Sequence, residues 1–326
     1  MSILITGAAG FIGFHLAEKL LEQGQSVIGV DNLNDYYDPT LKNNRLVALN
    51  KIDGFVFQKV DVSDRGQVET LMTENQDITE IVHLAAQAGV RYSLINPYIY
   101  TQSNVDAHLI LLEAARQLPA LKHFVYASSS SVYGANTQLP FSVDDRTDNQ
   151  VSLYGATKKA MEVISEAYSR TWALPLTGLR FFTVYGPWGR PDMAAFIFLK
   201  NIFSGEPIPV FNNGDMQRDF TYIDDIVAGV IACLNKPPVS GATAPLHRIY
   251  NIGNNRSEPL MRFISVIEET VGMRAQIEFL PIQPGDVKST YADISMSVRD
   301  FGFMPSTSID EGLPKLIAWY REYYGL

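Results

Sequence analysis

Short runs of β-branched and aliphatic residues alternate with longer amphipathic segments through the first half of the chain. Alternation of this kind is typical of parallel strands joined by helical crossovers. The runs predict strands at residues 3–6, 26–30, 55–60, 80–84, 123–127 and 176–182. We therefore expect an α/β fold built on a doubly wound parallel sheet.

The segments between these runs carry apolar residues at helical spacing. Apolar residues recur every fourth position from Ile12 to Leu20, and Gly24 follows as a C-cap. Further helices are predicted over residues 97–117 and 153–171. Both are long enough to form an interface between protomers, although packing of both against the sheet fits the same pattern.

The second half of the chain shows a looser pattern. Glycines and prolines mark a loop at residues 186–191, and residues 207–210 form a short extended piece. A helix is predicted over residues 223–234. Polar loops at residues 212–219 and 283–287 are of the kind that carries binding residues. This half therefore predicts a smaller lobe.

Composition narrows the class of protein. The chain has 326 residues, 46% hydrophobic and 19% charged, as expected for one large or two packed globular domains. The formal net charge of −9 and the scattered basic residues argue against a nucleic-acid partner. No apolar run approaches the roughly 18 residues of a membrane-spanning helix. Because Met1 leads directly into a strand, without the basic segment of a signal peptide, we expect a cytoplasmic protein.

The single cysteine carries little chemistry. Cys233 lies within the apolar helical pattern of residues 226–234. It has no second cysteine with which to form an internal disulfide or a metal cluster. We expect a buried small hydrophobe, and no metal site.

A glycine-rich turn links the first strand to its helix. Gly7, Gly10 and Gly13 stand where a tight turn lets a pyrophosphate approach the backbone amides of a helix N-terminus. Asp31 ends the second strand, eighteen positions after Gly13. Its carboxylate can accept hydrogen bonds from ribose hydroxyls and would repel a 2′-phosphate, which favours NAD over NADP. The alternative is that Asp31 caps the turn before Asn32.

Asp61 is a weaker candidate for the same site. It follows the third predicted strand, where a carboxylate could contact the adenine of a dinucleotide. An N-cap of the next helix is an equally good interpretation.

A tyrosine and a lysine stand one helical turn apart. Tyr154 and Lys158 share a helix face, and the preceding strand runs into the serines of residues 128–131. A tyrosine is a base near neutral pH only if nearby positive charge lowers its pKa from about 10. Lys158 and an oxidised nicotinamide can supply that charge, and a serine hydroxyl can relay the proton. The alternative is an exposed helix pair after a flexible serine loop.

These motifs together resemble the extended short-chain dehydrogenase/reductase superfamily, in particular its nucleotide-sugar epimerases and dehydratases. The resemblance spans nearly the whole chain and includes Asn104 and residues 83–86, 180–187 and 218–225. It implies a Rossmann-type domain for NAD over residues 1–182, with some exchange of a strand and a helix. A smaller α/β lobe over residues 183–326 would mainly bind the nucleotide sugar, and a homodimer is expected.

The resemblance also implies roles for individual residues. Ser129, five positions before the glycine of the Val-Tyr-Gly motif, would complete a catalytic triad with Tyr154 and Lys158. The expected cofactor-binding residues are Gly7, Gly10, Phe11, Ile12, Gly13, Asp31, Asn32, Asp61, Val62, Leu84, Ala85, Ala86, Asn104, Tyr154 and Lys158. The expected substrate-binding residues are Ser129, Ser130, Ser131, Thr183, Arg190, Val210, Phe211, Arg218 and Asp286. Arg218 would face the diphosphate, and Val210 and Phe211 would lie near the uracil.

The residues next to Ser129 distinguish the members of the superfamily. Similar dehydratases carry an Asp-Glu pair here and similar decarboxylases a glutamate, whereas this chain has Ser130 and Ser131. Dehydration and decarboxylation are therefore disfavoured. Residues 31–38 and 186–193 look like those of UDP-glucuronate 4-epimerases, in which the arginine matching Arg190 approaches the sugar carboxylate, helped by the threonine matching Thr183. A guanidinium suits a planar carboxylate, although Arg190 could also be a solvated loop residue or a phosphate ligand.

One position departs from related UDP-galactose 4-epimerases. Those enzymes carry a second diphosphate arginine three residues before an aspartate, and the matching residue here is Gln283. The resemblance therefore leaves open how the second phosphate is held.

The sequence predicts an NAD-dependent 4-epimerase that converts UDP-glucuronate to UDP-galacturonate through a 4-keto sugar. Tyr154 would remove the C4 hydroxyl proton, with Ser129 as relay, and Lys158 would lower the Tyr154 pKa and orient the ribose. The alternatives are a UDP-glucose/UDP-galactose 4-epimerase, or a redox-silent protein that binds NAD or a nucleotide sugar.

Overall fold

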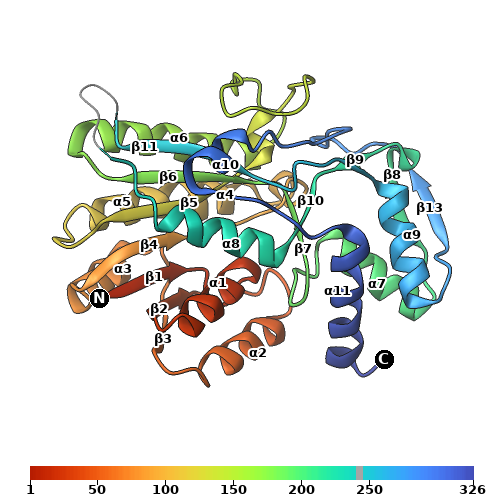
Figure 1. The fold of residues 1–326 in the computed structure, drawn as a ribbon, viewed down its shortest axis with the longest axis horizontal. Helices are drawn as coiled ribbons and strands as arrows, with labels where there is room; N and C mark the ends of the chain where they lie inside the picture. The colour runs from red at the N-terminus through yellow and green to blue at the C-terminus, as the bar shows by residue number, and fades with distance from the viewer. Residues whose placement is uncertain (240–244) are drawn as a thin grey trace.

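The computed structural model describes residues 1–239 and 245–326. Within these residues a sheet of seven parallel strands has the order β11-β6-β5-β4-β1-β2-β3 (Figure 1). The strands are β1 (Ser2–Thr6), β2 (Ser26–Asp31), β3 (Phe55–Lys59), β4 (Ile78–His83), β5 (His123–Ser129), β6 (Leu176–Phe181) and β11 (His247–Ile252). The strand order reverses between β1 and β4, which is the switch point beside which α/β proteins bind ligands. The predicted doubly wound, Rossmann-type sheet is confirmed.

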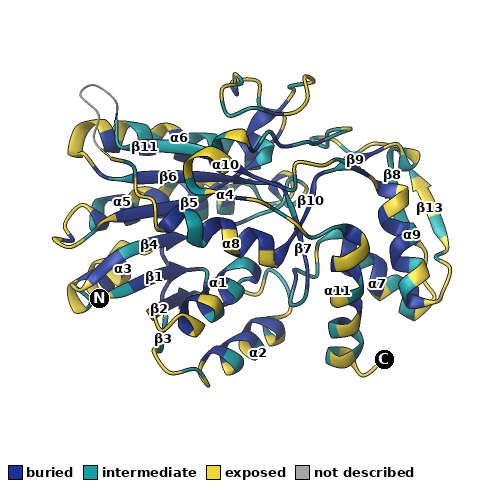
Figure 2. Cartoon of the chain, viewed as in Figure 1, coloured by how far each residue is buried: buried dark blue, intermediate teal, exposed yellow. Residues whose placement is uncertain are grey.

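Helices cover both faces of this sheet. Side chains alternate along β1, so that Ile3 and Ile5 join one apolar cluster while Leu4 joins the other. One face carries α1 (Phe11–Glu22) and α8 (Ile223–Leu234), and the other carries α3 (Arg65–Glu74), α5 (Ala107–Ala115) and α6 (Leu153–Trp172). Figure 2 shows most of the central strands buried, which explains why they appear in the sequence as continuous apolar runs.

A smaller lobe follows β6. In the part of the chain that the structure describes, it contains three two-stranded sheets. They pair β7 (Thr183–Tyr185) with β10 (Phe220–Tyr222), β8 (Ile208–Phe211) with β13 (Ile277–Leu280), and β9 (Gln217–Arg218) with β12 (Glu258–Pro259). Helices α7 (Ala194–Ser204), α9 (Leu260–Val271) and α11 (Ile309–Tyr324) pack beside them. The other short elements are α2 (Pro39–Leu49), α10 (Ser295–Phe301), η1 (Tyr92–Leu94), η3 (Ser130–Tyr133) and η4 (Asn212–Gly214).

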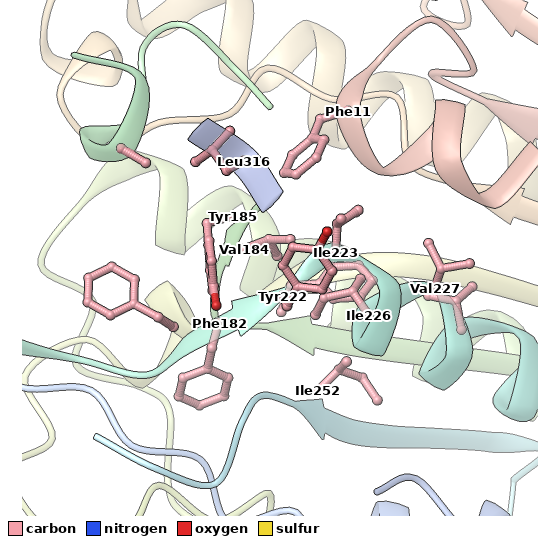
Figure 3. Packing of buried hydrophobic residues seen from close by; sticks show 14 of the residues in the cluster. Phe11, Phe182, Val184, Tyr185, Tyr222, Ile223, Ile226, Val227, Ile252 and Leu316 are labelled. Atoms are coloured by element: carbon pink, nitrogen blue, oxygen red, sulfur yellow. The ribbon is translucent and has the colours of Figure 1, made fainter. Parts of the chain in front are cut away.

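One apolar cluster joins the sheet to the smaller lobe. Figure 3 shows Phe11 of α1, Ile252 of β11 and Leu316 of α11 around the aromatic rings of Tyr185 and Tyr222. Helix α8 and strand β11 come late in the sequence, yet they complete the helix layer and the sheet of the first half. The sheet and the smaller lobe therefore share one core, and the predicted division of binding roles at residue 182 stays a prediction.

The predicted strands are all present, with ends that differ by one or two residues. Strand β8 matches the extended piece predicted at residues 207–210, and α6 and α8 match their predicted helices. Strand β11 was not predicted, because its sequence His-Arg-Ile-Tyr-Asn-Ile is too polar for a simple apolar run. It forms an edge of the sheet, where polar side chains are tolerated.

The helix predicted over residues 97–117 is interrupted. It consists of α4 (Pro97–Tyr100), a π-helical segment η2 (Thr101–Asp106), and α5. The wide turn includes Asn104, whose buried side chain accepts a hydrogen bond from the Gln87 backbone N–H (2.8 Å) and donates to the Gln87 carbonyl (3.0 Å). A one-residue expansion of the helix is too small to show in the apolar spacing.

Cys233 is buried in α8, as expected. Among the described residues, no group of three or more His, Cys, Asp or Glu side chains is arranged to hold a metal ion. A search of the same residues finds no helix with both the length and the apolar character needed to span a membrane.

Candidate active site

A cavity of about 690 Å³ lies at the carboxyl ends of the central strands, between the sheet and the smaller lobe. Residues from both halves of the chain line it. Those predicted from the sequence are Gly7, Gly10, Phe11, Ile12, Gly13, Asp31, Asn32, Asp61, Val62, Leu84, Ala85, Ala86, Ser129, Ser130, Ser131, Tyr154, Lys158, Thr183, Arg190, Phe211, Arg218 and Asp286. The fold therefore brings together most of the predicted cofactor, catalytic and substrate residues.

Two predicted residues lie outside the cavity wall. Val210 is fully buried because its side chain points to the opposite face of β8 from Pro209 and Phe211, which line the cavity. Its side chain therefore does not line the cavity, and its place near the uracil stays a prediction. Asn104 is also fully buried. Its side chain does not line the cavity but forms hydrogen bonds with the backbone of Gln87, which does.

The glycine turn forms a bare backbone cradle at the start of α1. Gly7 has a φ of +74°, which favours glycine, and a Cβ on Gly13 would lie 2.1 Å from the Gly7 carbonyl oxygen. Gly10 is the N-cap of α1, and no side chain caps the free N–H groups in the first turn of this helix. A helix N-terminus with open amides suits a pyrophosphate, so the turn fits the predicted dinucleotide.

Two carboxylates, those of Asp31 at the end of β2 and Asp61 shortly after β3, line the cavity together with this turn. Asp31 is almost buried, accepts a hydrogen bond from the Leu33 backbone N–H (2.8 Å), and lies 3.6 Å from Lys42 Nζ. It is thus both a turn cap and a cavity residue. Asp61 does not cap α3, because Asp64 occupies that position.

The carboxylate of Asp61 is held close to the cavity instead. It accepts hydrogen bonds from the Ser63 backbone N–H (2.9 Å) and the Asn32 side-chain amide (3.1 Å). Although burial opposes ionisation, the hydrogen bond from the Ser63 hydroxyl, together with those from the Ser63 backbone and Asn32, lowers the pKa of Asp61.

Ser129, Tyr154 and Lys158 meet at the same end of the sheet. Ser129 ends β5, and α6 begins one residue before Tyr154 because the Ser152 hydroxyl caps it by accepting a hydrogen bond from Gly155 N–H (3.0 Å). Lys158 Nζ donates to the carbonyl oxygen of Ala127 in β5 (2.9 Å). Local structure therefore orients all three side chains toward the cavity.

Burial and nearby groups have opposing effects on the pKa of Tyr154. Burial raises the pKa of Tyr154, while the nearby Ser129 hydroxyl and the charge of Arg190 act in the opposite direction. Burial also lowers the pKa of Lys158 to about 7. Arg190 is the nearby charge that lowers the Tyr154 pKa, and the lowering expected from Lys158 stays a prediction. Any effect of the bound nicotinamide stays a prediction.

Arg190 extends into the cavity from the loop after β7. Its Nε and Nη2 atoms donate to the two carboxylate oxygens of Asp192, at 3.0 and 2.5 Å, and the Tyr36 hydroxyl donates to Asp192 Oδ2 at 3.1 Å. Burial disfavours charge on Arg190, but the charge and hydrogen bonds of Asp192 outweigh it and raise its pKa. Burial would likewise raise the pKa of Asp192, but Arg190 lowers it. Both shifts favour the charged forms of the Arg190–Asp192 pair.

A second cluster of charges lies where the smaller lobe closes the cavity. Arg218 donates through Nη1 to the backbone carbonyls of Gln217 (2.8 Å) and Lys288 (3.1 Å). Arg91 lies 3.4 Å from the Asp286 carboxylate and 4.3 Å above the ring of Phe211. This pocket end has two arginines beside an aromatic ring, which suits the diphosphate and base of a nucleotide.

Sequence reasoning missed Arg91 as a candidate residue. Its only signal is position, since it follows β4 in a loop at the carboxyl edge of the sheet. Gln283 does not line the cavity, and Lys288 pairs instead with Asp215 at 2.6 Å. Tyr36 and Asp192 lay within motifs noted in the sequence, but no chemical pattern there indicated that they touch.

Three comparisons with known proteins agree with this geometry. A family model described as the NAD dependent epimerase/dehydratase family matches residues 3–253. Protein CapI of Staphylococcus aureus is 48% identical and is aligned over 99% of each chain. UDP-glucuronate 4-epimerase 6 of Arabidopsis thaliana is 45% identical over 100% of this chain and 73% of its own length. A crystal structure of a UDP-glucuronic acid 4-epimerase from Bacillus cereus, in complex with UDP-glucuronic acid and NAD, matches with a TM-score of 0.91 and 34% identity, covering 99% of this chain and 100% of that one.

Proposed function

Because this chain belongs to the NAD-dependent epimerase/dehydratase family, we propose that it inverts C4 of UDP-glucuronate to give UDP-galacturonate. One observation carries the proposal. A single cavity contains the glycine turn, the Ser129, Tyr154 and Lys158 set, and the Arg190 guanidinium. The similar Bacillus cereus enzyme binds both NAD and UDP-glucuronic acid.

The catalytic residues move a proton at the C4 hydroxyl. Tyr154 accepts this proton and later returns it, and the Ser129 hydroxyl relays it between the sugar and the phenol. Lys158 would donate to the ribose of NAD, and it adds positive charge when protonated. Bound NAD supplies a reversible hydride acceptor for C4. The 4-keto sugar then presents its other face before the alcohol is formed again.

The nucleotide end of the substrate stays bound while the sugar turns. Arg218 and Arg91 lie at the diphosphate end of the cavity, and Phe211 offers a ring to the uracil. Arg91 takes the place of the second diphosphate arginine that is absent at Gln283. A guanidinium contributes charge-assisted hydrogen bonds to phosphate oxygens.

A uronate adds a chemical hazard to the reaction. A C4 ketone with a C5 carboxylate is a β-keto acid, which loses carbon dioxide when the carboxylate bond aligns with the carbonyl π system. Arg190, Thr183 and the hydroxyls of Ser130 and Ser131 line the cavity where they can hold the carboxylate out of alignment. This requirement explains why an arginine is useful here.

A UDP-glucose/UDP-galactose 4-epimerase is the second candidate. It is favoured by one observation, since the charge of Arg190 is already paired with Asp192 and a neutral hydroxymethyl group could also be accommodated. The intact Ser129, Tyr154 and Lys158 set disfavours a redox-silent binding protein.

Product analysis tests these functions. The purified protein is incubated separately with UDP-glucuronate and UDP-glucose, and the nucleotide sugars are separated and identified. We expect UDP-galacturonate from the first and little product from the second. The matched control is Tyr154→Phe, which removes one oxygen and should reduce turnover below detection while UDP-sugar binding changes by only a few-fold. Normal epimerisation by this variant would contradict the proposed base.

We also propose that the protein works in the cytoplasm as a homodimer. In support of the dimer, α6 exposes the apolar residues Val163 and Trp172, and α4 exposes Tyr98. The need for NAD and a UDP-sugar supports the cytoplasmic location. Sedimentation analysis and cell fractionation would test the two statements separately.

A further inference from the structure

The ion pair between Arg190 and Asp192 has a consequence for substrate binding. Asp192 occupies the Nε and Nη2 edge of the guanidinium with both carboxylate oxygens. Among the residues that the structure describes, Arg190 Nη1 has no hydrogen-bond partner. The side chains of both residues remain partly exposed to the cavity, at 22% for Arg190 and 29% for Asp192. A ligand can therefore reach the free end of the guanidinium but must approach Asp192 as well.

Asp192 is fixed from the cofactor half of the molecule. The Tyr36 hydroxyl donates to its Oδ2 atom, and Tyr36 itself belongs to the segment between β2 and α2. The ring of Tyr36 packs 4.8 Å from the ring of Tyr92. Hydrogen bonds from Arg190 and from Tyr36, which lie in two separate segments, therefore hold the Asp192 carboxylate in place.

The charges of the pair matter for a uronate. Arg190 alone would present a full positive charge, whereas the pair presents donors without net charge. A substrate carboxylate on the Nη1 side would be attracted to Arg190 and repelled by Asp192 across a few ångströms. A neutral hydroxymethyl group could accept hydrogen bonds from the same Arg190 donors, and the charge of Asp192 would hardly repel it.

We propose that Asp192 is a specificity-determining residue that weakens the hold of Arg190 on the sugar carboxylate while fixing the plane of the guanidinium. This inference rests on the proposed function. C4 inversion requires the keto sugar to present both faces in turn, so its carboxylate must leave Arg190 within each turnover. A guanidinium with uncompensated charge would keep the sugar in one orientation.

The decisive variant is Asp192→Asn. Asparagine keeps the shape and one acceptor oxygen for Arg190 but removes the negative charge. We expect UDP-glucuronate to bind about 3- to 30-fold more tightly, because a like charge a few ångströms away is removed. Binding of UDP-glucose should stay within about twofold, and kcat for UDP-glucuronate should fall several-fold as KM falls.

The chain offers a matched control for the charge change. Arg146 and Asp148 form an exposed pair with the same two-residue spacing, and neither lines the cavity. Asp148→Asn should leave both dissociation constants unchanged. Asp192→Glu, which keeps the charge, should retain the wild-type preference within about threefold. If Asp192→Asn does not fold, Asp192→Ser removes the same charge with a smaller side chain.

Calorimetry with both nucleotide sugars, together with steady-state kinetics, gives the outcomes. Unchanged or weaker UDP-glucuronate binding by the Asp192→Asn protein would overturn the inference, and so would tighter binding without a fall in kcat. Either result could occur while the wild-type protein still makes UDP-galacturonate. A wild-type protein that does not act on UDP-glucuronate would instead overturn the proposed function.

Discussion

Lys158 carries its amino group deep inside the protein, where its side chain is almost fully buried. The hydrogen bond to the Ala127 carbonyl is its only contact of that kind among the described residues. Burial lowers its pKa to about 7, so folding opposes the protonated form. The buried amino group of Lys158, which the reaction needs, therefore lowers the stability of the folded protein, as is common at active sites.

The stability of the nucleotide-free protein should report this cost. An unfolded chain with a lysine pKa near 10.5 binds more protons than the folded protein between about pH 7 and pH 10.5, so stability rises with pH through this window. Lys158→Met should raise the free energy of unfolding by about 1–2 kcal/mol at pH 7.5. This gain should shrink toward pH 10.5. Urea denaturation at several pH values would measure it, and a variant less stable than wild type at pH 7.5 would refute it.

A second prediction for a single residue concerns Arg190. Arg190→Ala removes a charge-assisted contact worth about 1.5–3 kcal/mol, or about 10- to 150-fold in affinity for UDP-glucuronate. Binding of UDP-glucose should hardly change. The freed carboxylate of the keto sugar should also yield some UDP-4-keto-pentose, detectable by mass spectrometry. Equal weakening for both sugars would instead make Arg190 a diphosphate ligand.

Helix α2 supports the loop that carries Arg190 and Asp192. Arg45 of α2 is fully buried and donates to the carbonyl oxygens of Ala9 (2.8 Å), Trp188 (2.5 Å) and Gly189 (3.2 Å). Trp188 adopts a φ of +58°, which is unusual for a tryptophan. One side chain thus holds the glycine turn and the Arg190 loop together.

Replacement of Arg45 should loosen both elements. Arg45→Met leaves several buried carbonyl groups without donors, so we expect a loss of about 2–4 kcal/mol in the free energy of unfolding. Arg65→Met is a suitable control, because Arg65 is exposed on α3 and, among the described residues, pairs only with Glu69 one turn away. That control should change stability by less than about 0.5 kcal/mol. Equal effects in urea denaturation would show that Arg45 does not join the two elements.

At the scale of the whole molecule, one apolar core joins the sheet to the smaller lobe. The cluster in Figure 3 joins α1, α8, β11 and α11, which come from both ends of the chain. The cavity lies between these halves, so a ligand contacts both. Cooperative unfolding is the expected consequence.

Two measurements check this cooperativity. The full chain should unfold in a single transition when followed by far-ultraviolet and near-ultraviolet circular dichroism. A fragment of residues 1–182 should not fold stably, because it lacks β11 and α8. A fragment that unfolds cooperatively, or a full chain with two separate transitions, would show that the halves are independent domains.

Local pattern was enough to predict much of the scaffold. Strands buried on both faces leave apolar runs, and the glycine turn, Tyr154 and Lys158 lie within single segments whose backbone geometry depends on neighbouring residues. The resemblance to a known superfamily then added Ser129 and Arg190. The apolar runs and the spacing of these motifs are properties of the sequence itself. The fold and the family could therefore be predicted from them, and both predictions are confirmed.

Tertiary structure decided what the sequence could not. Arg91 and Asp286 are 195 positions apart, and Tyr36 and Asp192 are 156 apart, so no local pattern could pair them. The polar edge strand β11 is recognisable only beside β6. Spacing by itself determined which side chains share a helix or a turn. The folding of distant segments onto one cavity determined which charges meet, because an ion pair depends on distance in space and not on separation along the chain.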